Sequence, residues 1–208
     1  DLAAYRADLN AVSQGQPASE RWPAVFAALG PILEQWQLPL PLLTDLLSAF
    51  EQDIVQTRYA NKAELLDYCR RSANPIGRLL LHLYGVQGAK ALAQSDCICT
   101  ALQLVNFWQD LSEDIPRGRV YLPADLQTKH GVTEAELLSQ QLSSNTRALV
   151  ADSVDWARRL MRQGAPLVKQ VPGRAGWELR LVVQGGLRIA ERIEQLDFAT
   201  LQQRPVIG

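Results

Sequence analysis

Five polar side chains near the middle of the chain have types and spacing suited to chemistry. Gln103, Asn106, Asp110 and Asp114 fall at i, i+3, i+7 and i+11, which aligns them along one side of an α-helix, and Glu113 borders the same stripe. The residues between them are largely apolar, so the helix is expected to be buried, where carboxylates are costly unless a positive group compensates them. Mg²⁺ would supply that charge, because it binds carboxylates, waters and phosphate oxygens.

A second interpretation of the same residues is a solvated helix end. Asp110, Glu113 and Asp114 would then be surface carboxylates paired with Arg117 and Arg119. Acidic residues near a helix C-terminus interact unfavourably with the helix dipole, so local stability does not explain the pattern. The spacing therefore favours a functional stripe, and the surface alternative stays open at this point.

Helices are the elements expected to position this stripe. Apolar residues recur at helical spacing without clean period-2 alternation, and Gly and Pro fall between the apolar segments. Ser19, Asn61 and Thr133 stand where helices are expected to begin. These features predict one all-α bundle over residues 1–208. The predicted helices cover about residues 1–14, 20–36, 40–57, 62–84, 88–115, 134–142, 145–170 and 174–197.

Two proline-containing segments interrupt the helical pattern. Pro75 lies inside the stretch 62–84 and is expected to kink or break that helix near Asn74. The segment from Pro116 to Pro123 is the clearest long break and follows directly on the acidic stripe.

The composition excludes several other classes of protein. The net charge is −1 and no Lys/Arg block occurs, so no nucleic-acid partner is expected. No apolar run is long enough to cross a membrane. The three cysteines, Cys69, Cys97 and Cys99, and an N-terminus without a signal-peptide pattern favour a reducing, cytoplasmic location. The cysteines are expected as small buried hydrophobes, with a mixed Cys and His zinc site as the alternative. His82 is expected as a core residue rather than a catalyst.

The stripe is one of several motifs, in order along the chain, that together resemble the squalene/phytoene synthase family. The family's second aspartate-rich motif is matched by Gln103-x-x-Asn106-x-x-x-Asp110-x-x-Glu113-Asp114, then Gly118-Arg119-Val-Tyr121-Leu-Pro123. Its upstream region is matched by Asp53-x-x-x-x-Arg58-Tyr59 and by Tyr68-Cys69-Arg-Arg-Ser-Ala-Asn74-Pro75-Ile-Gly77. Within the family, the segments around Asn74 and Gln109 look most like those of the bacterial hydroxysqualene synthases of hopanoid synthesis.

The resemblance implies an isoprenoid-synthase-type helical bundle around a central apolar cavity. It implies that Asp110, Asp114 and Glu113 are Mg²⁺ ligands, and that Tyr68 orients the departing diphosphate or exchanges a proton. The implied diphosphate-binding residues are Gln103, Asn106, Arg58, Arg117, Arg119 and Tyr121.

The implied substrate is presqualene or farnesyl diphosphate. In a hydroxysqualene synthase, water rather than hydride traps the cation, so Mg²⁺ is expected and NADPH is not. We hypothesise that Asn74 holds this water, because other family members usually carry Gly there. The competing structural roles are packing for Tyr68, capping of the kink for Asn74, and a buried pair of Asp53 with Arg58 that joins helices.

The family's first aspartate-rich motif has no match here, because Asp1 and Asp8 lack its spacing. Either the chain lacks the family's N-terminal segment, which carries this motif, or it is a degenerate member, and we therefore expect the 208-residue chain to be inactive by itself. Three rival functions remain: a sister enzyme that makes presqualene diphosphate, squalene or phytoene, a non-catalytic assembly factor on the same fold, and a plain helical interaction module whose acidic end is a solvated surface. The resemblance also implies a peripheral contact with the inner membrane, since substrate and product are hydrophobic.

Overall fold

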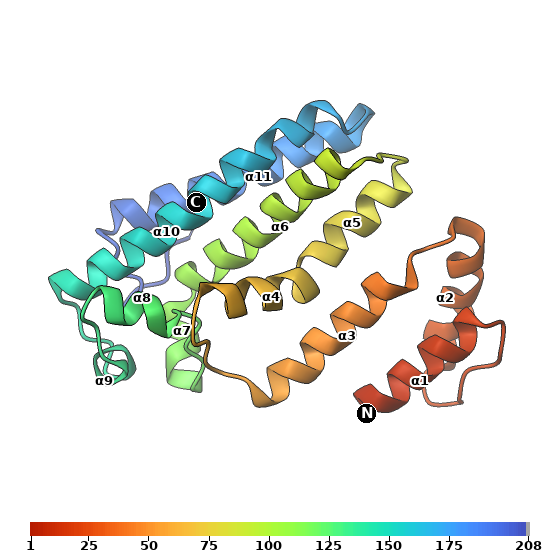
Figure 1. Cartoon of the computed structure of the whole chain (residues 1–208), viewed down its shortest axis with the longest axis horizontal. Helices are drawn as coiled ribbons and strands as arrows, with labels where there is room; N and C mark the ends of the chain where they lie inside the picture. Colours follow the sequence, from red (N-terminus) through yellow and green to blue (C-terminus); the bar gives the residue numbers. More distant parts are fainter. Residues whose placement is uncertain (207–208) are drawn as a thin grey trace.

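The computed structural model describes residues 1–206, and its regular elements in that range are helices. Figure 1 shows them as an elongated bundle with α1 and α2 at one end. The α-helices are α1 (Leu2–Ser13), α2 (Pro23–Trp36), α3 (Leu40–Val55), α4 (Lys62–Ser72), α5 (Asn74–Leu83), α6 (Ala89–Gln109), α7 (Leu111–Asp114), α8 (Ala124–Lys129), α9 (Glu134–Leu138), α10 (Ser144–Gly164) and α11 (Gly173–Gln195). Two short 3₁₀ helices are η1 (Ile115–Arg117) and η2 (Ala165–Lys169).

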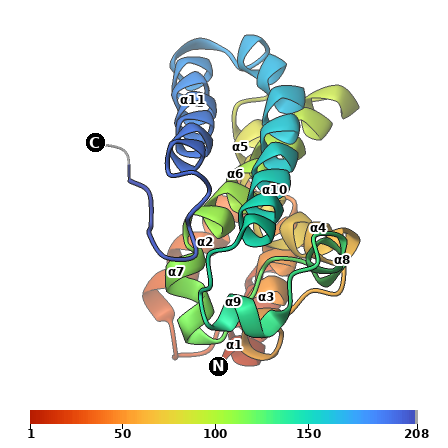
Figure 2. The same cartoon turned by 90° about the vertical axis from the view of Figure 1, so that its left-hand side faces the viewer.

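Helix α6 is the central element of the bundle. It packs most extensively on α10 and also contacts α4, α5 and α11 (Figures 1 and 2). Ala101, Leu104 and Trp108 on α6 have no exposed surface. The expectation of a helix buried around most of its circumference is confirmed, because the other helices surround it.

The acidic stripe does not lie on one continuous helix, so the predicted helix 88–115 is wrong at its C-terminal end. Helix α6 ends at Gln109, and Asp110 leaves the helical conformation with φ −100° and ψ 16°. Helix α7 then begins, which places Glu113 and Asp114 in a first turn. The break removes the conflict with the helix dipole, because negative charge is favoured at a helix N-terminus and disfavoured at a C-terminus.

Two of the expected helix starts are confirmed by side-chain hydrogen bonds. Asn61 Oδ1 accepts a hydrogen bond from the backbone N–H of Glu64 at 3.0 Å. Thr133 and Glu136 form a reciprocal capping box at the start of α9. These contacts satisfy backbone donors that a helix N-terminus otherwise leaves unpaired.

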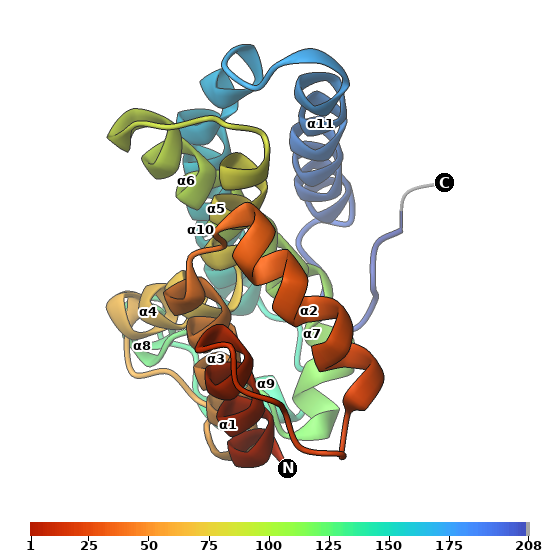
Figure 3. The same cartoon turned by 90° about the vertical axis from the view of Figure 1, so that its right-hand side faces the viewer.

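The expected helix start at Ser19 is wrong. Helix α2 begins at Pro23, whose fixed φ and missing N–H suit the first position of a helix. Ser19 instead donates its hydroxyl to Asp8 Oδ2 at 2.7 Å, and its backbone N–H donates to Asp8 Oδ1 at 2.8 Å. This contact ties the α1–α2 connection to α1 (Figure 3).

The break at Pro75 is confirmed. Ala73 separates α4 from α5, and Pro75 occupies the first turn of α5, where its missing N–H costs nothing. Helix α8 was not expected, and it lies between the predicted helices 88–115 and 134–142. No helix in residues 1–206 is long and apolar enough to cross a membrane.

Two glycines let neighbouring helices approach α6 closely. A Cβ on Gly77 of α5 would lie 2.3 Å from Ser95 Oγ and 2.5 Å from Cys99 Sγ. A Cβ on Gly164 of α10 would lie 2.6 Å from the Gln94 carbonyl oxygen, which is backbone and cannot rotate away. Helix α6 is therefore packed closely on both sides, and at Gly164 its backbone leaves no room for a Cβ.

We predict that Gly164→Ala lowers the free energy of unfolding by about 1–3 kcal/mol, because the added methyl overpacks the α6–α10 contact. The matched control is Gly185→Ala on α11, where a Cβ meets nothing within 4 Å. That change should be neutral or stabilise by up to ~1 kcal/mol, because alanine is the better helix former. Chemical denaturation of both variants provides the measurement. Equal stabilities would contradict the packing argument.

A second prediction concerns the ion pair that ties α8 to α10. Asp152 Oδ2 accepts from Lys129 Nζ at 2.6 Å and from His130 Nε2 at 3.1 Å. The hydrogen bond from Lys129 is the main cause that lowers the pKa of Asp152 to about 2. A depressed carboxyl pKa stabilises the fold above the unfolded-state pKa, and this stability is lost as pH falls towards the folded-state value.

Asp152→Asn should therefore cost about 1 kcal/mol at pH 7, a modest value because Lys129 is largely solvated. The difference from the parent should shrink between pH 4 and pH 2, roughly the interval between the unfolded and folded pKa values. Urea denaturation across this pH range tests it. Asp155→Asn, an exposed carboxylate on the same helix, should show no such pH dependence.

Candidate active site

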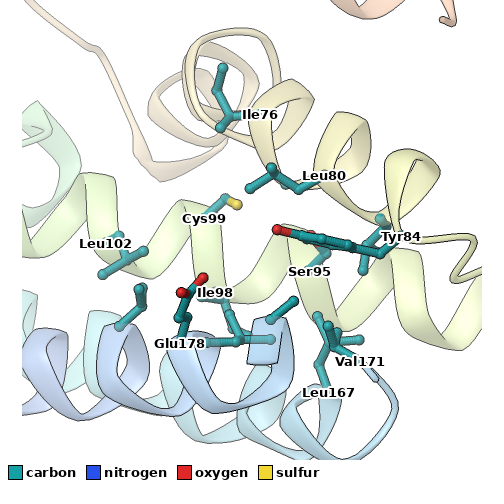
Figure 4. A pocket seen from close by; sticks show the side chains of 15 residues that line it. Ile76, Leu80, Tyr84, Ser95, Ile98, Cys99, Leu102, Leu167, Val171 and Glu178 are labelled. Atoms are coloured by element: carbon teal, nitrogen blue, oxygen red, sulfur yellow. The ribbon is translucent and has the colours of Figure 1, made fainter. Parts of the chain in front are cut away.

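One face of α6 joins an apolar cavity to the acidic stripe. Ser95, Cys99 and Leu102 line the cavity, and Asn106 and Asp110 continue the same face at helical spacing. The cavity has a volume of about 340 Å³ and lies among α5, α6, η2 and α11 (Figure 4). Its remaining lining residues are Ile76, Gly77, Leu80, Leu81, Tyr84, Ile98, Leu167, Val171, Ala175, Glu178, Leu179 and Val182.

Asp110 is held by two side chains at the polar end of this face. Asn106 Nδ2 donates to Asp110 Oδ2 at 2.8 Å, and Arg204 Nε donates to Asp110 Oδ1 at 2.5 Å. Gln109 Nε2 donates to the Pro205 carbonyl oxygen at 2.7 Å, which fixes the segment that carries Arg204. Figures 2 and 3 show this C-terminal segment running beside α7.

Asp114 is less well compensated than Asp110. Partial burial raises the pKa of its carboxyl group, and the negative charge of Asp110 raises it further. The charges of Arg119 and Arg117 act in the opposite direction without reversing the shift. The site therefore favours an added positive charge near Asp114, because burial and the negative charges of Asp110 and Glu113 disfavour its carboxylate form.

The predicted arginines play different roles in the structure. Arg117 lies 3.8 Å from Glu113 in an exposed pair, and Arg119 is exposed beside Tyr121. Both guanidinium charges act on the Asp114 carboxylate, so both arginines lie near the acidic end. Gln103, one turn before Asn106, is half-buried on the same face of α6.

Arg58 is already engaged by the protein. Its Nε donates to Glu134 Oε1 at 2.7 Å, and its Nη1 donates to the carbonyl oxygen of Gly118. Its backbone also bridges to Val120. Arg58 therefore holds the Gly118–Tyr121 segment in place, and the alternative pair with Asp53 is not formed.

Tyr68 belongs to an aromatic wall beside the polar end. It is buried, and burial is the main cause that raises the pKa of its phenol far above the ordinary value, with the negative charge of Asp53 acting in the same direction. Its ring centroid lies 6.1 Å from that of Phe107, which stacks on Tyr121 at 3.8 Å. Tyr68 therefore stays protonated at neutral pH and can only act as a phenol, by packing or hydrogen bonding.

Asn74 is buried where α5 meets α6. Its Oδ1 accepts a hydrogen bond from Thr100 Oγ1 at 3.0 Å. Its side chain makes no capping hydrogen bond at the start of α5, so the expected alternative of a kink cap is not formed. The amide Nδ2 makes no hydrogen bond to the protein within residues 1–206, so it is available to a ligand or a water.

Asp110, Glu113 and Asp114 do not form a complete metal-binding site by themselves. Within residues 1–206 no three His, Cys, Asp or Glu side chains come close enough to hold a metal ion by themselves. Cys69, Cys97 and Cys99 are unpaired thiols in that range, so no zinc site is formed. Asp110 and Asp114 still fit Mg²⁺, which commonly takes one or two carboxylates and completes its shell with water and phosphate oxygens.

Two residues differ from the sequence expectation. Arg204 was not predicted as a site residue, because it lies far from the motifs in sequence and outside any helical pattern. His82 was expected in the core, yet it is exposed at the end of α5 and its Nε2 lies 2.8 Å from the Trp36 carbonyl oxygen. Apolar neighbours in sequence hid the fact that His82 faces outward.

The sequence matches the family described as Squalene/phytoene synthase over residues 1–208. This chain belongs to that family. The phytoene synthase of Thermus thermophilus is 33% identical to it, covering 94% of this chain and 66% of the relative. The hydroxysqualene synthase of Sinorhizobium fredii is 34% identical, covering 79% of this chain and 57% of the relative. This chain therefore spans less than two thirds of the length of either relative.

Solved structures agree with the family assignment. A squalene synthase, HpnC, from Alicyclobacillus acidocaldarius superposes with a TM-score of 0.89 at 32% identity, covering 95% of this chain and 73% of that chain. A dehydrosqualene synthase in complex with a ligand superposes with a TM-score of 0.84 at 20% identity over 95% of this chain and 69% of that chain, which supports the fold alone. The predicted all-α isoprenoid-synthase fold is confirmed.

We predict that Arg204→Ala increases the affinity of the chain for Mn²⁺, used as a Mg²⁺ substitute, by several-fold. The guanidinium of Arg204 competes with a cation for Asp110 Oδ1, so its removal frees that oxygen. Isothermal titration calorimetry measures the affinity. Arg188→Ala removes an exposed arginine paired with Glu191 and is the control. An affinity that falls or stays constant in Arg204→Ala would contradict the competition.

Proposed function

We propose that this chain contributes the diphosphate-binding end and a hydrocarbon pocket to an active site that ionises a prenyl diphosphate. The observation that carries the proposal is that both features lie on one face of α6. Leu102 in the cavity wall lies eight residues from Asp110. At 1.5 Å per residue this is about 12 Å, within reach of one molecule that has a charged head and an isoprenoid tail.

The specific reaction proposed is presqualene diphosphate plus water giving hydroxysqualene plus diphosphate. The carbon–oxygen bond to diphosphate breaks and diphosphate leaves with the electron pair. The rearranged cation then accepts an electron pair from a water oxygen, and that water loses one proton. No electrons are gained or lost, so no NADPH is required.

The residues at the polar end would stabilise the departing diphosphate. Asp110 and Asp114 would hold Mg²⁺, which neutralises charge that develops on the leaving group. Glu113 is exposed beside them and would reach this cation only by changing rotamer or through water. Arg117 and Arg119 would bind phosphate oxygens through guanidinium N–H groups, a geometry suited to phosphate.

Neutral groups would complete the diphosphate site. Asn106 and Gln103 present amides one helical turn apart on α6, next to Asp110. Tyr121, stacked against Phe107 and close to the charge of Arg119, would hold that arginine towards the phosphate. Arg58 would act indirectly, because its bond to the Gly118 carbonyl oxygen fixes the segment that carries Arg119 and Tyr121.

The fate of the cation would depend on the buried side of the site. Tyr68 presents a phenol rather than a phenolate, so it cannot trap the cation as a nucleophile. Asn74 has a free amide beside α6 and is our candidate for holding the attacking water. Asn74→Ala, in a form of the protein that turns over substrate, should then change the ratio of hydroxysqualene to other products.

Support for the hydroxysqualene reaction comes from the relatives. Hydroxysqualene synthases from Sinorhizobium fredii, Zymomonas mobilis and Rhodopseudomonas palustris are 31–39% identical to this chain over the aligned segments. The second candidate is phytoene synthesis, favoured by the longer alignment with the Thermus thermophilus enzyme. A non-catalytic assembly factor is disfavoured because Asp110 and Asp114 are retained. Peripheral membrane contact and a cytoplasmic location belong to the proposal.

We predict that Asp110→Asn and Asp114→Asn each lower the Mg²⁺-dependent affinity for farnesyl thiodiphosphate, a non-hydrolysable analogue, by at least about tenfold. Each change removes one anionic ligand of the cation that bridges protein and diphosphate. Titration calorimetry with and without Mg²⁺ provides the measurement. Asp67→Asn, an exposed carboxylate with two arginine partners on α4, is the control.

Binding of the analogue that is independent of Mg²⁺, or unchanged in both variants, would contradict the proposed function. Product analysis of a catalytically active form of the protein with presqualene, farnesyl and geranylgeranyl diphosphates then separates hydroxysqualene from phytoene synthesis. We expect the 208-residue chain alone to bind without turnover.

A further inference from the structure

The cavity beside α6 is partly open to solvent along its side, since its lining residues Ile76, Leu80, Tyr84 and Val182 are 44–49% exposed. Leu102 lies at the end nearest to Asn106 and the acidic stripe, and the far end is lined by Tyr84, Ser95, Leu167 and Val171. The walls are apolar apart from a few groups, of which the Tyr84 hydroxyl is one. Figure 4 shows the Tyr84 ring lying across the cavity, with its hydroxyl directed inward. The side chain that limits the length of the cavity is therefore aromatic and bulky.

The position of Tyr84 along the cavity follows from the packing of α5 on α6. These helices are connected by a short loop and run antiparallel (Figure 1). Gly77 is level with Ser95 and Cys99, because a Cβ on Gly77 would touch both side chains. Tyr84 lies seven residues further along α5, so its backbone is about 10 Å further from the acidic stripe than Gly77. From this position the Tyr84 ring points back into the cavity, towards the level of Gly77 (Figure 4).

The length available along α6 for a hydrocarbon tail can be compared with the length of an isoprene unit. An extended backbone gains roughly 1.2 Å per covalent bond, so one isoprene unit of four bonds spans about 5 Å. Asn106 and Ser95 are eleven residues apart on α6, or about 16 Å. Three units, a farnesyl tail, therefore extend from the polar end to the level of Ser95. A fourth unit would enter the space that the Tyr84 ring occupies.

We infer that Tyr84 is a specificity-determining residue that limits the tail in this pocket to three isoprene units. The inference rests on the proposed function for the identity of the ligand as a prenyl chain, and it names the length of that chain. A limit of three isoprene units would favour substrates built from C15 chains over those built from C20 chains. It would therefore favour hydroxysqualene synthesis over phytoene synthesis. Tyr84 is half-exposed, so its replacement opens the far end to solvent without leaving a sealed void in the core.

The experiment measures the affinities of farnesol and geranylgeraniol for the chain, below their solubility limits, by quenching of intrinsic fluorescence. These alcohols lack diphosphate, so the readout depends on the tail pocket and not on Mg²⁺ or the acidic stripe. The parent chain should bind farnesol more tightly than geranylgeraniol. Tyr84→Ala should shift the ratio of the two affinities towards geranylgeraniol by at least about tenfold, since burial of about half of one isoprene unit removes enough apolar surface from water for this shift.

Two variants make the result specific. Leu83→Ala removes a neighbouring side chain that is similarly exposed but does not line the cavity, and it should leave the ratio as in the parent. Tyr84→Phe keeps the ring and should retain the parent preference. Thermal denaturation checks that each variant is folded. A ratio in Tyr84→Ala within twofold of the parent, or no binding of either alcohol to the parent, would overturn the inference. Loss of Mg²⁺-dependent diphosphate binding would instead refute only the proposed function.

Discussion

The packing of α6 is the constraint on which the rest of the structure depends. Leu104 and Trp108 are fully buried against neighbouring helices, and Gly77 and Gly164 let α5 and α10 approach the backbone of α6 closely. Close-packed interiors resist even small displacements, so the direction in which each side chain of α6 points is fixed. The remaining face carries cavity-lining residues at one end and Asp110 at the other. The relation between hydrocarbon pocket and charged end is therefore built into one rigid helix.

The charges at the end of α6 require a local change of backbone direction. A continuous helix would place three carboxylates in a last turn, where exposed carbonyl groups repel them. The break at Asp110 instead puts Glu113 and Asp114 at a helix N-terminus, and Arg204 from the C-terminal segment covers Asp110. Asp114 keeps a raised pKa in spite of these adjustments. Local helix geometry removes part of the repulsion, and the part that remains is the electrostatic basis for binding a cation together with an anionic ligand.

Local sequence signals predicted the features that depend on local physics. Helical periodicity located the bundle, Pro75 located the α4–α5 break, and Asn61 and Thr133 located two helix starts. The features that sequence reasoning missed depend on contacts between distant segments. Ser19 looked like a helix cap but binds Asp8. Similarly, the partner of Asp110 comes from 94 residues away, and no spacing rule relates residues that only the tertiary fold brings together.

The two ends of the α6 face would control different properties of the reaction. Charge and metal binding at Asp110 and Asp114 would determine whether a diphosphate can leave, and they carry no information about the hydrocarbon attached to it. The length of the cavity, closed by Tyr84, would determine which hydrocarbon fits, and it is indifferent to the leaving group. Members of one family could thus keep a common acidic motif and differ in substrate through residues remote from it. For this chain, the choice between a hydroxysqualene and a phytoene reaction is therefore to be sought at the apolar end of the cavity rather than in the aspartate-rich motif.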